Sequence, residues 1–162
     1  PTREAEDLKI QPGIALRQLA DPKEMIEVPG IGERGPRMLS KQLLSEVIEP
    51  RVEELFSLVQ AELRRSGFEE QISSGIVLSG GSSLMKGMVE LAEEVFHMPV
   101  RIGTPEYIGG FSERVRNPRF ATGVGLLLAG LEKHEIDEAA RIQGAGFKQI
   151  LERMKAWFQQ NF

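Results

Sequence analysis

A short apolar strand, a pair of glycines, a helix and a second short strand follow one another in the middle of this sequence. The strands are predicted at residues 75–79 and 100–102, and the helix between them at residues 83–97. Continuous apolar strands joined by a helix are typical of a parallel pair that helices cover. The chain is therefore predicted to have an α/β fold.

The sequence before this unit predicts a second, mainly helical region. Apolar residues recur at helical spacing from Lys41 to Arg65, which predicts one long helix packed along a single face. Pro50 lies inside it and lacks a backbone N–H, so we expect a kink or a junction between two helices there. A shorter helix is predicted from Thr2 to Ile10.

The remaining elements are shorter. Residues 21–36 are rich in proline and glycine, and this loop region is flanked by predicted strands at residues 24–28 and 37–39. A last core helix is predicted to begin with Pro118 and to run through Leu128.

Composition limits the classes of function. The 162 residues include 20 basic and 24 acidic side chains, so no overall positive field favours nucleic acid. Cysteine is absent and there are two histidines, which excludes a disulfide framework and makes a zinc site a poor fit. No apolar run approaches the roughly 20 residues that a membrane-spanning helix needs.

The last residues, 147–162, have the pattern of an amphipathic helix, and residues 133–146 before them are predicted to be a flexible linker. At about 100° per residue the apolar positions share an arc of roughly 140°. These are Phe147, Ile150, Leu151, Met154, Trp157, Phe158 and Phe162. The basic residues at the margins of the arc are Lys148, Arg153 and Lys155. Such a helix is predicted to lie on an anionic membrane; docking on the protein's own core or on a partner helix is the alternative.

The glycine pair Gly80-Gly81 comes directly after the first strand of the α/β unit. Glycines let the backbone approach a ligand closely, and a turn of this kind suits a phosphate or a nucleotide. A tight turn that needs positive φ explains the pair equally well.

Two segments resemble the actin, Hsp70 and sugar-kinase superfamily. The run from Gly75 to Ser83 looks like its adenosine-binding segment, and Ala5-Glu6-Asp7-Leu8-Lys9 looks like its helix that supplies a Glu and a Lys to the nucleotide sugar. Within the superfamily the chain most resembles the FtsA family of bacterial cell-division proteins. The resemblance rests on Pro36-Arg37, residues 46–51, residues 95–103, and the terminal Trp157-Phe158 and Phe162.

The resemblance implies the second half of an actin-like (ribonuclease H-like) α/β fold. Subdomain 2B would span residues 1–52 and subdomain 2A residues 53–132, with the linker and the terminal helix after them. The sequence starts with Pro1 rather than methionine, so we expect a segment of a longer protein. ATP with Mg²⁺ would bind the full-length protein at Glu6, Lys9, Gly80, Gly81 and Ser82. This segment alone would bind ATP weakly or not at all.

The resemblance also implies partners and a place in the cell. Arg37, Lys41 and Arg51 would receive the acidic C-terminal peptide of the tubulin-like protein FtsZ. The alternatives are solvated surface charge, or a structural ion pair of Arg51 with Glu54 or with the neighbouring subdomain. The other implied partners are anionic lipids, further copies of the protein in actin-like filaments and other divisome proteins, with no nucleic acid. The implied function is a non-enzymatic adaptor that holds the FtsZ ring at the cytoplasmic face of the inner membrane. An ATP-hydrolysing or phosphotransfer enzyme and the platform protein of type IV pilus machinery are the alternative functions.

Overall fold

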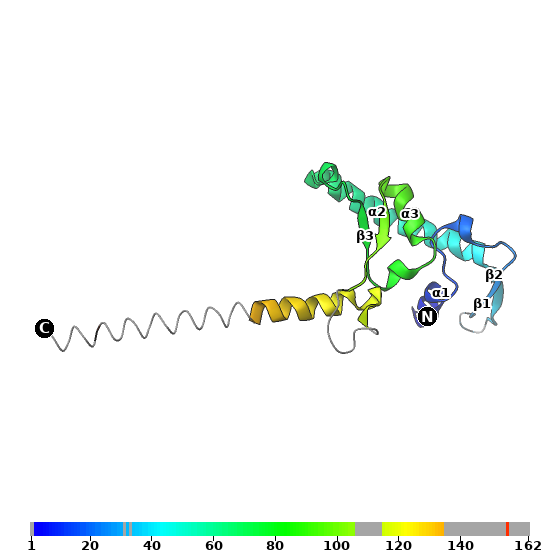
Figure 1. The fold of residues 1–162 in the computed structure, drawn as a ribbon. Coiled ribbons are helices and arrows are strands. Elements are labelled where there is room, and N and C mark those ends of the chain that lie inside the picture. The colour runs from blue at the N-terminus through cyan, green and yellow to red at the C-terminus, as the bar shows by residue number, and fades with distance from the viewer. Residues whose placement is uncertain (1, 31, 33, 106–114, 135–154, 156–162) are drawn as a thin grey trace. The chain divides into compact units, whose positions relative to one another are not determined.

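The computed structural model describes residues 2–30, 32, 34–105, 115–134 and 155. The fold is mixed α/β, as the sequence predicts (Figure 1). It divides into one compact unit at residues 1–121 and a second at residues 122–162, and each is described by itself. The α-helices and strands of the first unit are α1 (Thr2–Ile10), β1 (Met25–Val28), β2 (Arg37–Ser40), α2 (Lys41–Ser66), β3 (Ile76–Leu78), α3 (Met88–Phe96) and β4 (Val100–Ile102). Its short 3₁₀ helices are η1 (Arg17–Leu19), η2 (Glu69–Gln71), η3 (Gly81–Leu84) and η4 (Pro118–Phe120).

Helix α2 has a defined cap at each end. The Ser40 hydroxyl accepts a hydrogen bond from the Leu43 N–H at 3.2 Å, which satisfies a donor that the first helical turn leaves open. At the other end Gly67 adopts the left-handed conformation with φ 74°, and its N–H donates to the Arg64 carbonyl. The predicted bounds of this helix are therefore confirmed to within one residue.

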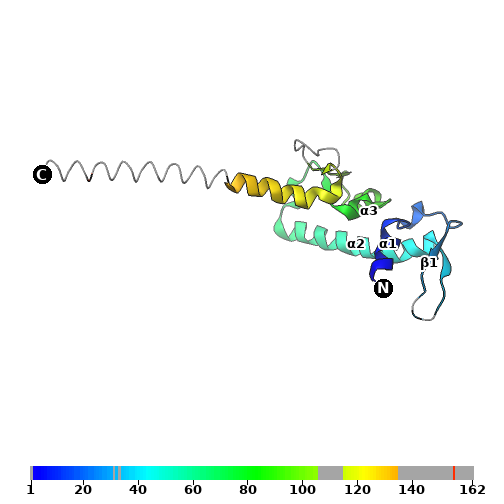
Figure 2. The ribbon, with the colours of Figure 1, turned by 90° about the horizontal axis from the view of Figure 1, so that it is seen from below.

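Pro50 does not divide α2 into two helices. The helix runs unbroken through it (Figure 2), so the predicted junction is not formed. Contacts with η1 hold the helix on the N-terminal side of the proline. The backbone N–H of Arg17 donates to the Glu49 carboxylate, and the Arg17 guanidinium lies 3.4 Å from the Glu46 carboxylate. Such tertiary contacts can offset the hydrogen bond that proline removes.

The β1–β2 hairpin lies at the N-terminal end of α2 in both views (Figures 1 and 2). Its strands pair antiparallel, with Met25 opposite Ser40 and Val28 opposite Arg37. Two bonds between Lys41 and Glu24 close its base: the Lys41 N–H donates to the Glu24 carbonyl at 2.8 Å, and the two side chains form an ion pair. Both short strands predicted here are confirmed, each within one residue of its bounds.

Strands β3 and β4 form the predicted parallel pair, with Ile76 opposite Val100 and Leu78 opposite Ile102. Helix α3 is shorter than predicted, because it begins at Met88 instead of residue 83. The residues just before it pair with another part of the chain: the Ala15 N–H donates to the Lys86 carbonyl at 2.8 Å. Lys86 forms a parallel bridge with Ile14, and Met85 before it is extended, with φ −65° and ψ 134°, which an α-helix cannot include.

The core of the first unit lies between α2 and α3, which run close together in Figure 1. Its buried members are Ala15, Leu16, Val52, Phe56, Met88, Leu91, Ala92 and Phe96. The single packed face predicted for α2 is only partly correct, because two of its apolar residues at helical spacing, Leu55 and Val59, are exposed. These two side chains line an apolar hollow together with Val77 of β3.

In the second unit, residues 122–134 continue a helix that begins at residue 121, directly after η4. The first turn of the predicted core helix is thus a 3₁₀ turn. Lys133 and His134, which the sequence assigned to the start of the linker, are helical. Residues 135–146 and the terminal segment, apart from Lys155, lie outside the described residues. Among the described residues, no helix is both long enough and apolar enough to cross a bilayer.

Candidate functional site

The turn after β3 depends on glycine at one of its two glycine positions. Gly80 has φ 90° and ψ 170°, a conformation that residues with a side chain rarely adopt. Gly81 has no positive φ, and a side chain added there would meet the Cβ of Arg119 at an ordinary 3.8 Å. The conformation of the turn therefore explains Gly80 but not Gly81.

Helix η4 packs against this turn through its backbone. The Gly80 N–H donates to the Pro118 carbonyl at 3.1 Å. Asn117 caps η4, because its Oδ1 accepts a hydrogen bond from the Arg119 N–H at 3.1 Å. These two bonds fix where the Arg119 side chain leaves the backbone.

Helix α1 supplies a pair of opposite charges. Glu6 and Lys9 are three residues apart, so they share a face of the helix. The Lys9 ammonium lies 2.6 Å from the Glu6 carboxylate. Both side chains are partly exposed, which leaves donors and an acceptor free to bind a polar ligand.

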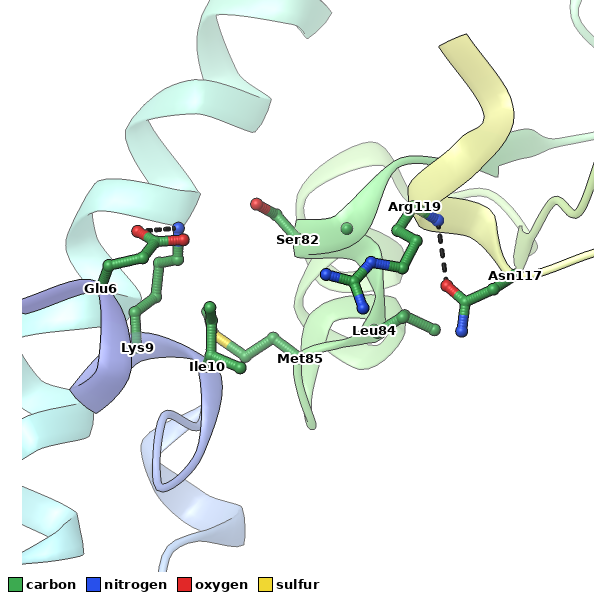
Figure 3. Close-up of a pocket in the computed structure, with 9 residues that line it drawn as sticks. Glu6, Lys9, Ile10, Ser82, Leu84, Met85, Asn117 and Arg119 are labelled. Atoms are coloured by element: carbon green, nitrogen blue, oxygen red, sulfur yellow. Dashed lines mark hydrogen bonds and ion pairs between the residues drawn. The ribbon is translucent and has the colours of Figure 1, made fainter. Parts of the chain in front are cut away.

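These elements surround a pocket of about 530 Å³ (Figure 3), within the range of about 300–1,000 Å³ that is typical of small-molecule sites. Residues from α1, η3 and η4 line it: Glu6, Lys9, Ile10, Gly81, Ser82, Leu84, Met85, Asn117 and Arg119. In Figure 3 the Arg119 side chain extends from η4 toward the wall that carries Glu6 and Lys9. The pocket combines groups that can bind hydroxyls with apolar side chains, so it suits a ligand that has both hydroxyl groups and an apolar part.

The structure brings together four of the five residues predicted to bind nucleotide, since Glu6, Lys9, Gly81 and Ser82 all line this pocket. Gly80 is not among the lining residues and shapes the turn instead. The sequence prediction missed Ile10, Leu84, Met85, Asn117 and Arg119. Asn117 and Pro118 carry a recognisable N-cap pattern, but nothing local in the sequence places that cap beside the glycine turn.

The structure places the residues predicted to bind a peptide on β2 and on α2. Arg37 lies on β2 and is exposed, whereas Lys41, at the first position of α2, forms the ion pair with Glu24. Arg51 lies about 15 Å further along the helix by its rise per residue. Its guanidinium is 3.1 Å from the Glu54 carboxylate. The ion pair that the sequence offered as the alternative role of Arg51 is thus present.

The residues predicted to bind the membrane lie outside the described residues, with the exception of Lys155. That residue is helical and exposed. Within the described ranges, no group of three or more His, Cys, Asp or Glu side chains is arranged to hold a metal ion.

Comparison with known proteins gives the family. The model of a family described as "Cell division protein FtsA" matches residues 1–125. This chain belongs to the FtsA family. Relatives with that same name are 52% identical in Pseudomonas aeruginosa, 43% in Neisseria meningitidis serogroup B and 38% in Escherichia coli strain K12. Each comparison covers 100% of this chain, which spans 40%, 40% and 41%, respectively, of the lengths of these FtsA relatives.

Proposed function

We propose that this chain is the part of a bacterial cell-division adaptor that holds a cytoskeletal partner next to the membrane. The observation that carries the proposal is the match of the FtsA family model over residues 1–125, together with identity to FtsA relatives along the whole chain. In this proposal residues 1–52 form subdomain 2B and residues 53–132 form subdomain 2A of an actin-like fold. The linker follows the helical Lys133 and His134 and ends at residue 146, and residues 147–162 are the helix that binds anionic lipid at the cytoplasmic face of the inner membrane.

The proposed partner is the acidic C-terminal peptide of FtsZ, bound near Arg37, Lys41 and Arg51. Arginine suits an acidic peptide because its planar head pairs with a carboxylate through two hydrogen bonds. Lys41 and Arg51 each form an ion pair with a glutamate. Arg37 is exposed, and the structure describes no ion pair for it. We further propose that the whole protein associates into filaments and recruits other division proteins. Its role is that of an adaptor rather than an enzyme.

The proposed cofactor is ATP, bound by the whole protein. The residues that line the pocket fit the nucleoside part of that ligand: Glu6 and Lys9 offer an acceptor and a donor for the sugar hydroxyls. Ile10, Leu84 and Met85 offer apolar surface for the base. Among the described residues, no group of three or more His, Cys, Asp or Glu side chains is arranged to hold Mg²⁺. In this proposal the ligands of the metal and of the phosphates come mainly from the rest of the protein.

Vesicle co-sedimentation of the full-length protein with FtsZ tests the adaptor. The wild-type protein is expected to sediment with anionic vesicles and to carry FtsZ with it. Replacing both Trp157 and Phe158 by glutamate places two charges on the proposed lipid face, so neither protein should then sediment. Replacing Gln159 and Gln160 by glutamate adds the same charge away from that face and should change little. Sedimentation of the Trp157→Glu/Phe158→Glu variant at the wild-type level would contradict the proposal.

A further inference from the structure

Arg119 is an arginine that the structure brings to the nucleotide pocket from a distant part of the sequence. Its backbone is fixed by the cap from Asn117 and by the bond between the Gly80 N–H and the Pro118 carbonyl. The start of its side chain lies next to the glycine turn, because its Cβ is 3.8 Å from where a Cβ on Gly81 would be. In Figure 3 the guanidinium points into the pocket. Arg119 is therefore held with its charged end over the ligand position.

Two parts of a nucleotide can bind a guanidinium: the phosphates, through charge and hydrogen bonds, and the base, through stacking on its planar face. The pocket of Arg119 has polar lining residues, Lys9, Ser82 and Asn117, and apolar ones, Ile10, Leu84 and Met85. The three apolar side chains favour the base, because they can contact its planar ring and need no hydrogen bond from it.

The ring of Phe120 supports the same choice. The Arg119 Cζ lies 5.6 Å from the centroid of that ring, a distance at which a guanidinium is attracted to a π face. A guanidinium has two faces, so one can lie against Phe120 while the other is presented to the pocket. Arginine can stack on a base in this way, whereas the ammonium of lysine has no plane to stack.

We infer that Arg119 is the residue that binds the base: its guanidinium stacks on the purine ring of the nucleotide while Glu6 and Lys9 bind the sugar. This inference rests on the proposed ATP binding, which it deepens. Stacking acts on the base alone, so Arg119 contributes equally to the binding of adenosine and of ATP. Pairing with phosphate would contribute to the binding of ATP only.

The test measures dissociation constants for ATP and for adenosine, the latter by competition, with the full-length protein. Arg119→Ala is expected to weaken the binding of ATP and of adenosine by about tenfold each, as is typical when a side chain that stacks on a base is removed. Arg119→Lys keeps the charge but not the plane, so it should weaken both ligands to a similar extent. Arg116→Ala removes an exposed arginine that does not line the pocket and should change neither.

Three outcomes would overturn the inference. In the first, Arg119→Ala weakens ATP but not adenosine while Arg119→Lys restores ATP binding, which would assign the guanidinium to phosphate. In the second, both Arg119 variants bind ATP as the wild type does, and the proposed ATP binding then stands without this residue. In the third, the wild-type protein binds no ATP, and the proposed cofactor then fails together with the inference. Melting of the ligand-free variants checks their folding, which should be intact because Arg119 is exposed.

Discussion

The ring of Phe56 on α2 lies 5.5 Å, centroid to centroid, from the ring of Phe96 on α3, with the two planes inclined at 52°. This tilted contact is a favourable arrangement for aromatic rings, and both side chains are about 95% buried. Beside it the Gln60 amide donates to the Val95 carbonyl at 2.9 Å. The middle of α2 and the end of α3 are thus joined by an apolar contact and a polar one.

Removing one ring of that pair should destabilise the first unit strongly. Phe96→Ala leaves a cavity in the core, and the expected loss in the free energy of unfolding is about 3–5 kcal/mol. Phe68 is 55% exposed, so Phe68→Ala is a matched control that should cost far less. Chemical denaturation followed by circular dichroism measures both. Equal midpoints for the two variants would show that Phe96 does not belong to the core.

The two glycines of the turn should respond differently to alanine. Gly80→Ala forces a side chain into a conformation that suits glycine, at an expected cost of about 1–3 kcal/mol. Gly81→Ala meets only an ordinary contact with Arg119, so the fold should tolerate it. Thermal melting of the two variants compares these effects. A larger loss from Gly81→Ala than from Gly80→Ala would contradict the described turn.

An exposed ion pair on α2 lowers the pKa of the Glu62 carboxyl. Two hydrogen bonds from Arg65, at 2.8 and 2.5 Å, lower the pKa of Glu62 below its ordinary value of 4.5. A carboxyl whose pKa falls on folding contributes stability above its ordinary pKa, and this contribution is lost as the pH drops through the lowered value. Arg65→Ala should return the Glu62 pKa toward 4.5, as measured by NMR titration of its side-chain carbon. No change in that pKa would show that the pair does not form in solution.

Under the proposed function, the basic residues should bind an acidic FtsZ peptide unequally. Arg37→Glu is expected to weaken the binding of the peptide by about 1–3 kcal/mol, because it removes a charge-assisted hydrogen bond. The loss should be larger at low salt. Arg51 is already engaged by Glu54, so Glu54→Gln should free it and strengthen binding. Fluorescence anisotropy of a labelled peptide measures both changes.

Arg64 gives the control for the peptide experiment, because it is paired with Glu69 near the other end of α2. Arg64→Glu makes the same charge change far from the proposed site and should leave the affinity unaltered. If Arg37→Glu and Arg64→Glu weaken the binding of the peptide equally, the effect comes from the net charge of the protein and not from a specific binding site.

Local patterns in the sequence were sufficient to predict the elements that are stabilised by interactions between residues close together in the chain. The bounds of α1 and α2 and the glycine turn follow from periodicity, caps and turn residues. These depend on neighbours within a few positions along the chain, so the order of residues is enough to predict them.

Only the tertiary structure decided what depends on distant segments. The bridge between Ala15 and Lys86 moves the start of α3 to Met88, and contacts from Arg17 accompany the unbroken course of α2 through Pro50. Packing also selected Phe56 for the core while Leu55, its neighbour, stayed exposed. Arg119 reached the pocket for the same reason: the hydrogen bond that holds η4 on the turn joins residues far apart in sequence, and periodicity carries no information about such a contact.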